Sequence, residues 1–266
     1  MYATTYARAT SLDDAVAKLK AAEDGKFLGG GQTLIATMKQ RLAAPSDVID
    51  VTKIPELKGI AFDGTTLKIG AASTHSEVQR SEDVRQAIPA LASLAATIGD
   101  PAVRNMGTMG GVLANNDPAA DYPAAVMAMD GTVVTSKGSY KPHEFFQGMF
   151  ETALDEDEII VRIEFPKPQR AAYEKFRNPA SRYSLCSVFV AVTASGETRV
   201  AVTGSGNDGV FRVAEMEEAL AANWSPDAVS GIAISPDLML SDIHGSAEYR
   251  AHLVTVLAGR AVAKAA

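Results

Sequence analysis

The sequence predicts an α+β fold in two parts, and three observations lead to this prediction. Residues 161–165 alternate apolar and charged side chains and end at Pro166, which is the clearest strand signal in the chain. The prolines within residues 166–169 interrupt regular structure, so we place a domain boundary there. Mixed strands and helices precede this boundary, whereas a β-hairpin and two helical patterns follow it.

The N-terminal part is expected to begin with a helix and a short strand. Ser11 is a suitable N-cap, Asp14 follows it at capping-box spacing, and a helical apolar period starts at Leu12. Residues 27–28 are expected to form a strand that leads into three consecutive glycines. A second helix is expected over residues 34–42, because a proline soon follows.

The middle of the chain is expected to add strands at residues 48–51, 67–71 and 133–134. Residues 84–98 show a helical pattern in which Pro89 marks either a first turn or a break. Residues 99–123 are rich in Gly, Asn, Asp and Pro. We expect a long functional loop there, because connections of this length are rarely passive.

Beyond the boundary, the pattern predicts a hairpin and two helices. Runs rich in β-branched residues at 188–193 and 199–203 flank a turn-forming segment, and helical patterns follow at 213–220 and 247–263. Residues 204–209 match G-x-G-x-x-G, which is a dinucleotide fingerprint only between a parallel strand and a helix. Because the preceding strand belongs to a hairpin, we interpret this segment as a turn.

Composition and charge exclude several functions. The 266 residues carry 25 basic against 32 acidic side chains, a net charge of −7, so a nucleic-acid partner is not expected. No apolar run is long enough for a membrane span, and the N-terminus lacks a signal-peptide pattern, so we expect a cytoplasmic location. The single cysteine, Cys186, cannot hold a zinc cage or an iron–sulfur cluster alone, and we expect it to be structural.

Two glycine-rich segments carry the functional signal. The first, residues 29–33, lies between a predicted strand and helix, where converging backbone N–H groups bind anions such as phosphate. The second spans residues 104–123 and combines glycines with Asn115, Asn116, Asp117 and Asp121. A carboxylate here suits a ribose or ribityl hydroxyl. A tight turn, a structural loop and a weak two-carboxylate metal site remain as alternatives.

These segments resemble the two FAD-binding signatures of molybdenum hydroxylase flavoproteins. Residues 30–34, together with the stretch from Met38 to Asp50, resemble the first signature. Residues 98–111 and 117–123 resemble the second. The pattern is similar to the medium subunit of aerobic carbon monoxide dehydrogenases and to the FAD-binding subunit of xanthine dehydrogenases, and it covers nearly the whole chain.

The resemblance implies an FAD-binding fold of the p-cresol methylhydroxylase/vanillyl-alcohol oxidase (PCMH) type. Residues 1–168 would form the FAD-binding domain, with subdomains at about 1–53 and 54–168 on either side of the flavin. Residues 169–266 would form a small C-terminal α+β domain like that of carbon monoxide dehydrogenase flavoproteins.

The resemblance also implies which residues contact FAD. Both glycine segments would hold its pyrophosphate, Asp121 would bind the cofactor, Ile160 would contact the flavin ring, and Tyr183 would lie beside it. A basic residue, Lys175 or Arg177, would also take part. The predicted cofactor residues are Gly29, Gly30, Gly31, Gln32, Thr33, Thr108, Met109, Gly110, Gly111, Val112, Asp121, Ile160, Lys175 and Tyr183.

The implied function is electron transfer, with no catalytic residue or metal site in this chain. FAD would take electrons from [2Fe–2S] clusters of a small partner subunit and pass them to an external acceptor. A large partner subunit would carry molybdopterin, and the complex would be a dimer of heterotrimers. Two alternatives remain open: a stand-alone FAD-dependent oxidoreductase with its own substrate, and a non-redox nucleotide-binding protein.

Overall fold

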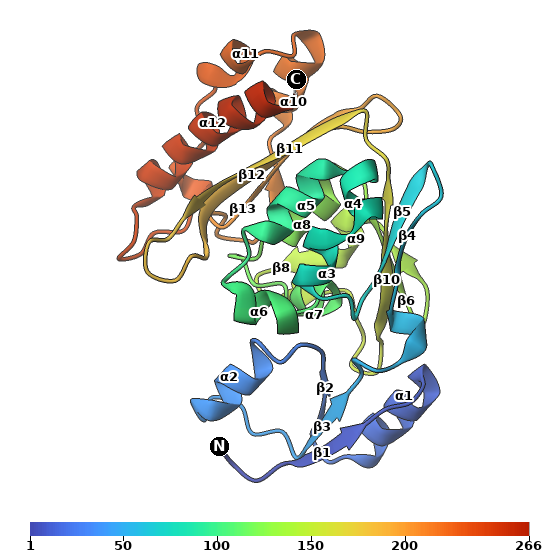
Figure 1. The fold of residues 1–266 in the computed structure, drawn as a ribbon. Helices are drawn as coiled ribbons and strands as arrows, with labels where there is room; N and C mark the ends of the chain where they lie inside the picture. The colour runs from blue at the N-terminus through green and yellow to red at the C-terminus, as the bar shows by residue number, and fades with distance from the viewer. Residues whose placement is uncertain (266) are drawn as a thin grey trace.

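Four β-sheets with surrounding helices make up the described part of the protein, residues 1–265 of a computed structural model (Figure 1). The N-terminal sheet, the central sheet and the C-terminal sheet follow one another along the chain, and a small β-ribbon accompanies the central sheet. The α+β prediction is therefore confirmed. No helix among the described residues is both long and apolar enough to cross a membrane.

The N-terminal sheet is parallel and has the strand order β1 (Thr5–Arg8), β3 (Asp47–Asp50), β2 (Gly25–Leu28). Parallel neighbours require crossover connections, which contain α1 (Leu12–Ala21) and α2 (Leu34–Lys39). Ser11 caps α1 as predicted, but the Asp14 carboxylate accepts from Thr10 and not from Ser11, so the capping box is incomplete. Helix α2 ends at Lys39, three residues before the predicted end.

The central sheet is antiparallel. Its order is β4 (Ile60–Phe62), β5 (Thr66–Gly70), β10 (Ile160–Pro166), β6 (Thr132–Thr135), β7 (Ser139–Tyr140). Helices α3 (His75–Arg80), α4 (Glu82–Ala87), α5 (Pro89–Ala96) and α8 (Tyr122–Ala128) pack beside it and share one large apolar cluster with it. The strand predicted from the alternation at 161–165 is therefore the middle strand of this sheet.

In the middle of the chain, the expected break or first turn at Pro89 is confirmed, whereas the long loop expected over 99–123 needs correction. The helical pattern over 84–98 is two helices, α4 and α5, and Pro89 occupies the first turn of α5 after a break at Ile88. The segment 99–123 is not a long loop, because it contains α6 (Pro101–Met106), α7 (Met109–Asn115) and the start of α8. Small residues that signal turns by themselves are helical here because neighbouring elements pack against them.

The C-terminal sheet is antiparallel, with the order β11 (Arg170–Arg177), β12 (Ser184–Val192), β13 (Thr198–Thr203), β14 (Phe211–Arg212). Strand β12 is buried on both faces, because Phe189 packs in the central cluster and Val188 in the C-terminal cluster. The latter cluster also includes residues of α10 (Ala214–Ala222), α11 (Pro226–Ser230) and α12 (Ala247–Lys264).

Strand β11 was not predicted from the sequence. Residues 204–209 follow the antiparallel strand β13 as a turn, as predicted.

Short elements complete the chain: the ribbon strands β8 (Phe146–Gly148) and β9 (Glu151–Thr152), helix α9 (Pro142–Phe145), and the 3-10 turns η1 (Pro55–Leu57) and η2 (Pro236–Leu238).

Candidate functional site

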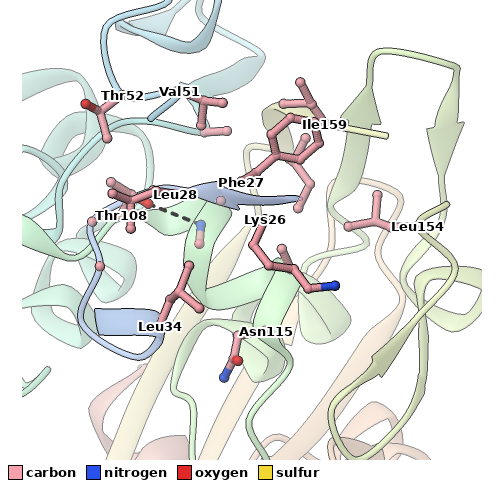
Figure 2. Close-up of a pocket in the computed structure, with 18 of the residues that line it drawn as sticks. Lys26, Phe27, Leu28, Leu34, Val51, Thr52, Thr108, Asn115, Leu154 and Ile159 are labelled. Atoms are coloured by element: carbon pink, nitrogen blue, oxygen red, sulfur yellow. Dashed lines mark hydrogen bonds between the residues drawn. The ribbon is translucent and has the colours of Figure 1, made fainter. Parts of the chain in front are cut away.

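A cleft of about 910 Å³ lies between the N-terminal sheet and the elements around the central sheet. This volume is near the upper end of the range for ligand pockets. Figure 2 shows Phe27 and Leu28 from β2, Thr108 and Asn115 from the two ends of α7, and Leu154 and Ile159 from the segment between β9 and β10. The walls come from residues within 19–34, 51–52, 71–75, 107–115 and 154–160.

The first glycine segment presents a row of unpaired backbone donors. Strand β2 ends where Leu28 O accepts from Val51 N at 3.1 Å, and the chain then turns away from the sheet, with Gly31 at a φ of +71°. None of the hydrogen bonds formed within residues 1–265 uses the N–H groups of residues 29–34. Consecutive free N–H groups beside a cleft favour an anion. A smaller hollow of about 410 Å³ adjoins residues 29–31 as well as Lys53 and Lys58.

The two glycine segments contact each other directly. A Cβ atom on Gly30 would overlap the carbonyl oxygen of Met106 and lie 2.6 Å from Gly107 Cα. A Cβ atom on Gly29 would lie 3.0 Å from Thr108 Oγ1. The glycines therefore allow two backbones to meet at this edge of the cleft.

In the second segment, unlike the first, the N–H groups of residues 109–112 are bonded within the chain, and its role in holding the pyrophosphate stays a prediction. Met109 N donates to Ser73 O at 3.0 Å, and Gly110 N donates to Ala71 O at 2.9 Å. Gly111 N donates to Thr108 Oγ1 at 3.2 Å, and Val112 N to Thr108 O at 3.1 Å. The bonds to Ser73 and Ala71 attach the start of α7 to the chain just after β5, and the first glycine segment packs against residues 106–107 of the second.

The structure brings most predicted cofactor residues to the cleft. The wall contains Gly29, Gly30, Gly31, Gln32, Thr33, Thr108, Gly110, Gly111, Val112 and Ile160. Four predicted residues are outside the lining of this cleft: Met109, Asp121, Lys175 and Tyr183. Met109 is completely buried in the central apolar cluster. The cofactor roles of all fourteen residues remain predictions.

Asp121 and Lys175 form a buried ion pair. Lys175 Nζ lies 2.8 Å from Asp121 Oδ1, with the two side chains 3% and 7% exposed. Tyr173 donates its hydroxyl to the same carboxylate, and burial raises the pKa of Tyr173 far above its ordinary value. Lys175 also donates to Thr97 O at 3.4 Å. Lys175 is therefore already paired inside the protein, whereas Arg177, the other basic residue predicted to contact FAD, is exposed.

Tyr183 lies in the turn between β11 and β12 and is 56% exposed. It follows Arg182, which has a φ of +64°. Partial burial, and the negative charges of Asp117 and Asp121, raise the pKa of Tyr183. Tyr183 therefore lies close to the buried pair and to the end of the second glycine segment, whereas Ile160 lies in the cleft.

The polar groups after α7 have mostly structural roles. Asn116 ends α7 in a left-handed conformation, and its amide donates to Gly148 O at 2.7 Å and Glu151 O at 2.9 Å. Asp117 Oδ1 accepts from Ala119 N at 2.8 Å. Within residues 1–265 no group of three or more metal-ligating side chains occurs, and the Asp121 carboxylate of the two-carboxylate alternative is paired with Lys175.

Sequence reasoning missed His75, which lines the cleft beside Gly107. Its imidazole is buried, and burial together with the charge of Arg104 lowers its pKa to about 4. The four histidines are scattered without metal-ligand spacing. Only the tertiary structure brings this one beneath the glycine segments.

The sequence is similar to a known family and to several known proteins over most of its length. The family model described as "FAD binding domain in molybdopterin dehydrogenase" matches residues 2–168. The chain is 34% identical to the nicotine 6-hydroxylase medium subunit of Paenarthrobacter nicotinovorans, over 99% of this chain and 97% of that one. It is 32% identical to the glyceraldehyde dehydrogenase medium chain of Sulfolobus acidocaldarius, over 97% and 96%.

Solved structures with a similar fold include chains of carbon monoxide dehydrogenase. A chain of carbon monoxide dehydrogenase from Hydrogenophaga pseudoflava superposes with a TM-score of 0.86 at 31% identity, covering 98% of this chain and 96% of that one. A chain of the reconstituted enzyme from Oligotropha carboxidovorans superposes with a TM-score of 0.89 at 31% identity, covering 99% and 97%.

Proposed function

Because the chain belongs to the family of FAD-binding domains of molybdopterin dehydrogenases, we propose that it is the FAD-binding electron-transfer subunit of a molybdenum hydroxylase complex. One observation carries this proposal. Six consecutive N–H groups, those of residues 29–34, have no acceptor within residues 1–265 and lie at the edge of a cleft of about 910 Å³. A diphosphate group is the anion that would satisfy them.

The chain's own role is to bind and orient the cofactor. Residues 29–34 would hold the diphosphate, and Thr108 and Gly111 would support that segment from behind. Apolar walls such as Phe27 and Ile160 would exclude water from the nucleotide. Bound FAD supplies the redox chemistry, since its ring takes up and releases electrons. Tyr183 would lie beside this ring, as the family resemblance implies.

Electrons must reach this subunit from another polypeptide. Cys186 is the only cysteine, it is completely buried, and burial raises the pKa of its thiol to about 12. We infer a small partner with [2Fe–2S] clusters and a large partner with molybdopterin, assembled as a dimer of heterotrimers in the cytoplasm. The names of the relatives, medium subunit and medium chain, support a multi-subunit complex.

The test is purification of the complex from its native host. We expect FAD in this chain, together with co-purifying chains that contain iron–sulfur clusters and molybdenum. Under anaerobic conditions the complex should reduce its flavin when substrate is added, whereas the separated FAD-loaded subunit should not. Substrate turnover by the subunit alone would favour a self-contained oxidoreductase. Absence of flavin absorbance in every preparation would contradict FAD binding itself.

A further inference from the structure

His75 is enclosed beneath the junction of the two glycine segments. It is the first residue of α3, only 2% exposed, and its backbone N–H donates to Gly107 O at 3.0 Å. The imidazole lies against the same glycine, since a Cβ atom on Gly107 would be 2.6 Å from His75 Nε2. Gly107 in turn touches Gly30, so the ring lies directly behind the contact between the two segments.

Both ring nitrogens lack a hydrogen-bond partner among residues 1–265. Nδ1 is completely buried without a hydrogen bond, and none of the hydrogen bonds of residues 1–265 uses Nε2. The neighbouring ring, Tyr122, lies 5.4 Å away between centroids and also has an unpaired hydroxyl. An unpaired buried polar side chain is costly and calls for an explanation.

The two nitrogens face different surroundings. Nδ1 is completely enclosed, whereas Nε2 lies against Gly107 on a residue that lines the cleft. Because burial and Arg104 keep the ring neutral at ordinary pH, it carries one N–H and one lone pair. A proton on Nε2 places a neutral donor against Gly107, which in turn contacts Gly30 of the first glycine segment.

We propose that His75 donates a hydrogen bond through Nε2 to the diphosphate of the bound nucleotide. This inference rests on the proposed function, because it needs FAD in the cleft. It adds a side-chain donor to the backbone donors, and it explains why a buried histidine has no partner among the described residues.

Three substitutions of His75 separate hydrogen bonding from packing. Glutamine places an amide N–H near the position of Nε2, asparagine places one near Nδ1, and phenylalanine fills the space without a donor. The dissociation constants of FAD and ADP would be measured by calorimetry on the flavin-free protein, together with the ³¹P shifts of bound ADP.

We expect H75Q to bind ADP nearly as the wild type does, with similar ³¹P shifts. H75F and H75N should bind about tenfold to a hundredfold more weakly, as expected for one lost hydrogen bond to a charged group. Wild-type affinity in H75F, or equal losses in all three variants, would overturn the inference.

A measurement on the wild type keeps the inference testable if a variant fails to fold. In protein with ¹⁵N-labelled histidine, ADP should make the Nε2 proton of His75 visible and slow its exchange. An unchanged His75 signal at saturating ADP would refute the hydrogen bond. If the wild type binds neither ADP nor FAD, the proposed function fails instead, so the two failures are distinguishable.

Discussion

At the scale of single residues, glycines in this cleft allow one backbone segment to lie close to another. Gly30 meets the Met106–Gly107 peptide, and a Cβ atom on Gly110 would lie 2.6 Å from Ala71 Cβ. A bulky residue at position 110 therefore disturbs packing against the central sheet before it affects any ligand. Gly111 is the better position for a binding test, because among residues 1–265 only Thr108 Oγ1, at 2.9 Å, lies within 4 Å of its missing Cβ.

We predict that Gly30→Ala separates the two glycine segments. The added methyl group overlaps backbone that cannot move without shifting Met106, so we expect a loss of about 1–3 kcal/mol in stability and of most bound FAD. Urea unfolding and flavin absorbance of the purified protein measure the two effects. Gly138→Ala is the matched control, because nothing lies within 4 Å of its missing Cβ. Full flavin occupancy in Gly30→Ala would contradict the prediction.

His75 should make stability depend on pH in the flavin-free protein. Its pKa falls from 6.5 to about 4 on folding, so the unfolded chain binds a proton at higher pH than the folded chain does. The free energy of unfolding is therefore not reduced by His75 above pH 6.5. It decreases by about 3 kcal/mol as the pH falls from 6.5 toward 4. Urea unfolding at several pH values measures this slope. In H75Q the slope within this window should be smaller, and an identical slope would exclude His75 as its source.

At the scale of elements, α7 lines the cleft and is held at both ends by contacts with neighbouring segments. Thr108 caps its first turn, and Asn116 ends it with a φ of +42°. Asn116 also fixes the β8–β9 turn, because Phe150 N donates to Asn116 O at 2.9 Å. The helix is short, so its position depends on these end contacts more than on its own propensity.

We predict that Asn116→Gly and Asn116→Ala differ by the cost of a left-handed backbone. Both lose two buried amide bonds, to Gly148 O and Glu151 O, which should cost about 1–3 kcal/mol. Alanine adds about 1 kcal/mol because glycine adopts this conformation freely. Urea unfolding of both variants measures the difference. Equal stabilities would mean that the backbone relaxes in the alanine variant.

At the scale of the whole molecule, the C-terminal sheet holds the segment after α7 in place. Thr203 Oγ1 donates to Ala120 O at 2.7 Å, and Gly204 N donates to Pro118 O at 2.8 Å. The buried pair of Asp121 and Lys175 connects the start of α8 to β11. The predicted flavin neighbour Tyr183 lies next to these connections, so the sheet positions it relative to the cleft.

We predict that Lys175→Met destabilises the protein by about 3–5 kcal/mol, because it leaves the Asp121 carboxylate buried without its cation. The double variant Asp121→Asn/Lys175→Met should recover much of this loss, since no charge remains unpaired. Chemical unfolding of both proteins measures the coupling. A double variant no more stable than Lys175→Met alone would exclude a direct charge pairing. FAD affinity of the double variant tests the predicted cofactor roles of both residues.

Local signals in the sequence were sufficient for much of the fold. The alternation at residues 161–165 predicted β10, and the hairpin of β12 and β13 followed from β-branched runs around a turn. Strand β11 was missed because its residues, Arg170–Arg177, mix charged and apolar side chains without a clear period. Helices α6 and α7 were missed because glycine, proline and asparagine are typical of loops when neighbours are unknown.

Residue types and their spacing were enough to predict the class of the protein, the two glycine segments and the lack of cysteine ligands for a cluster, because these properties are local along the chain. The packed fold was needed to show which N–H groups have no acceptor within residues 1–265, that Asp121 pairs with Lys175, and that His75 lines the cleft. Each of these depends on residues far apart in the sequence, and burial between packed elements fixes their charge and hydrogen bonding.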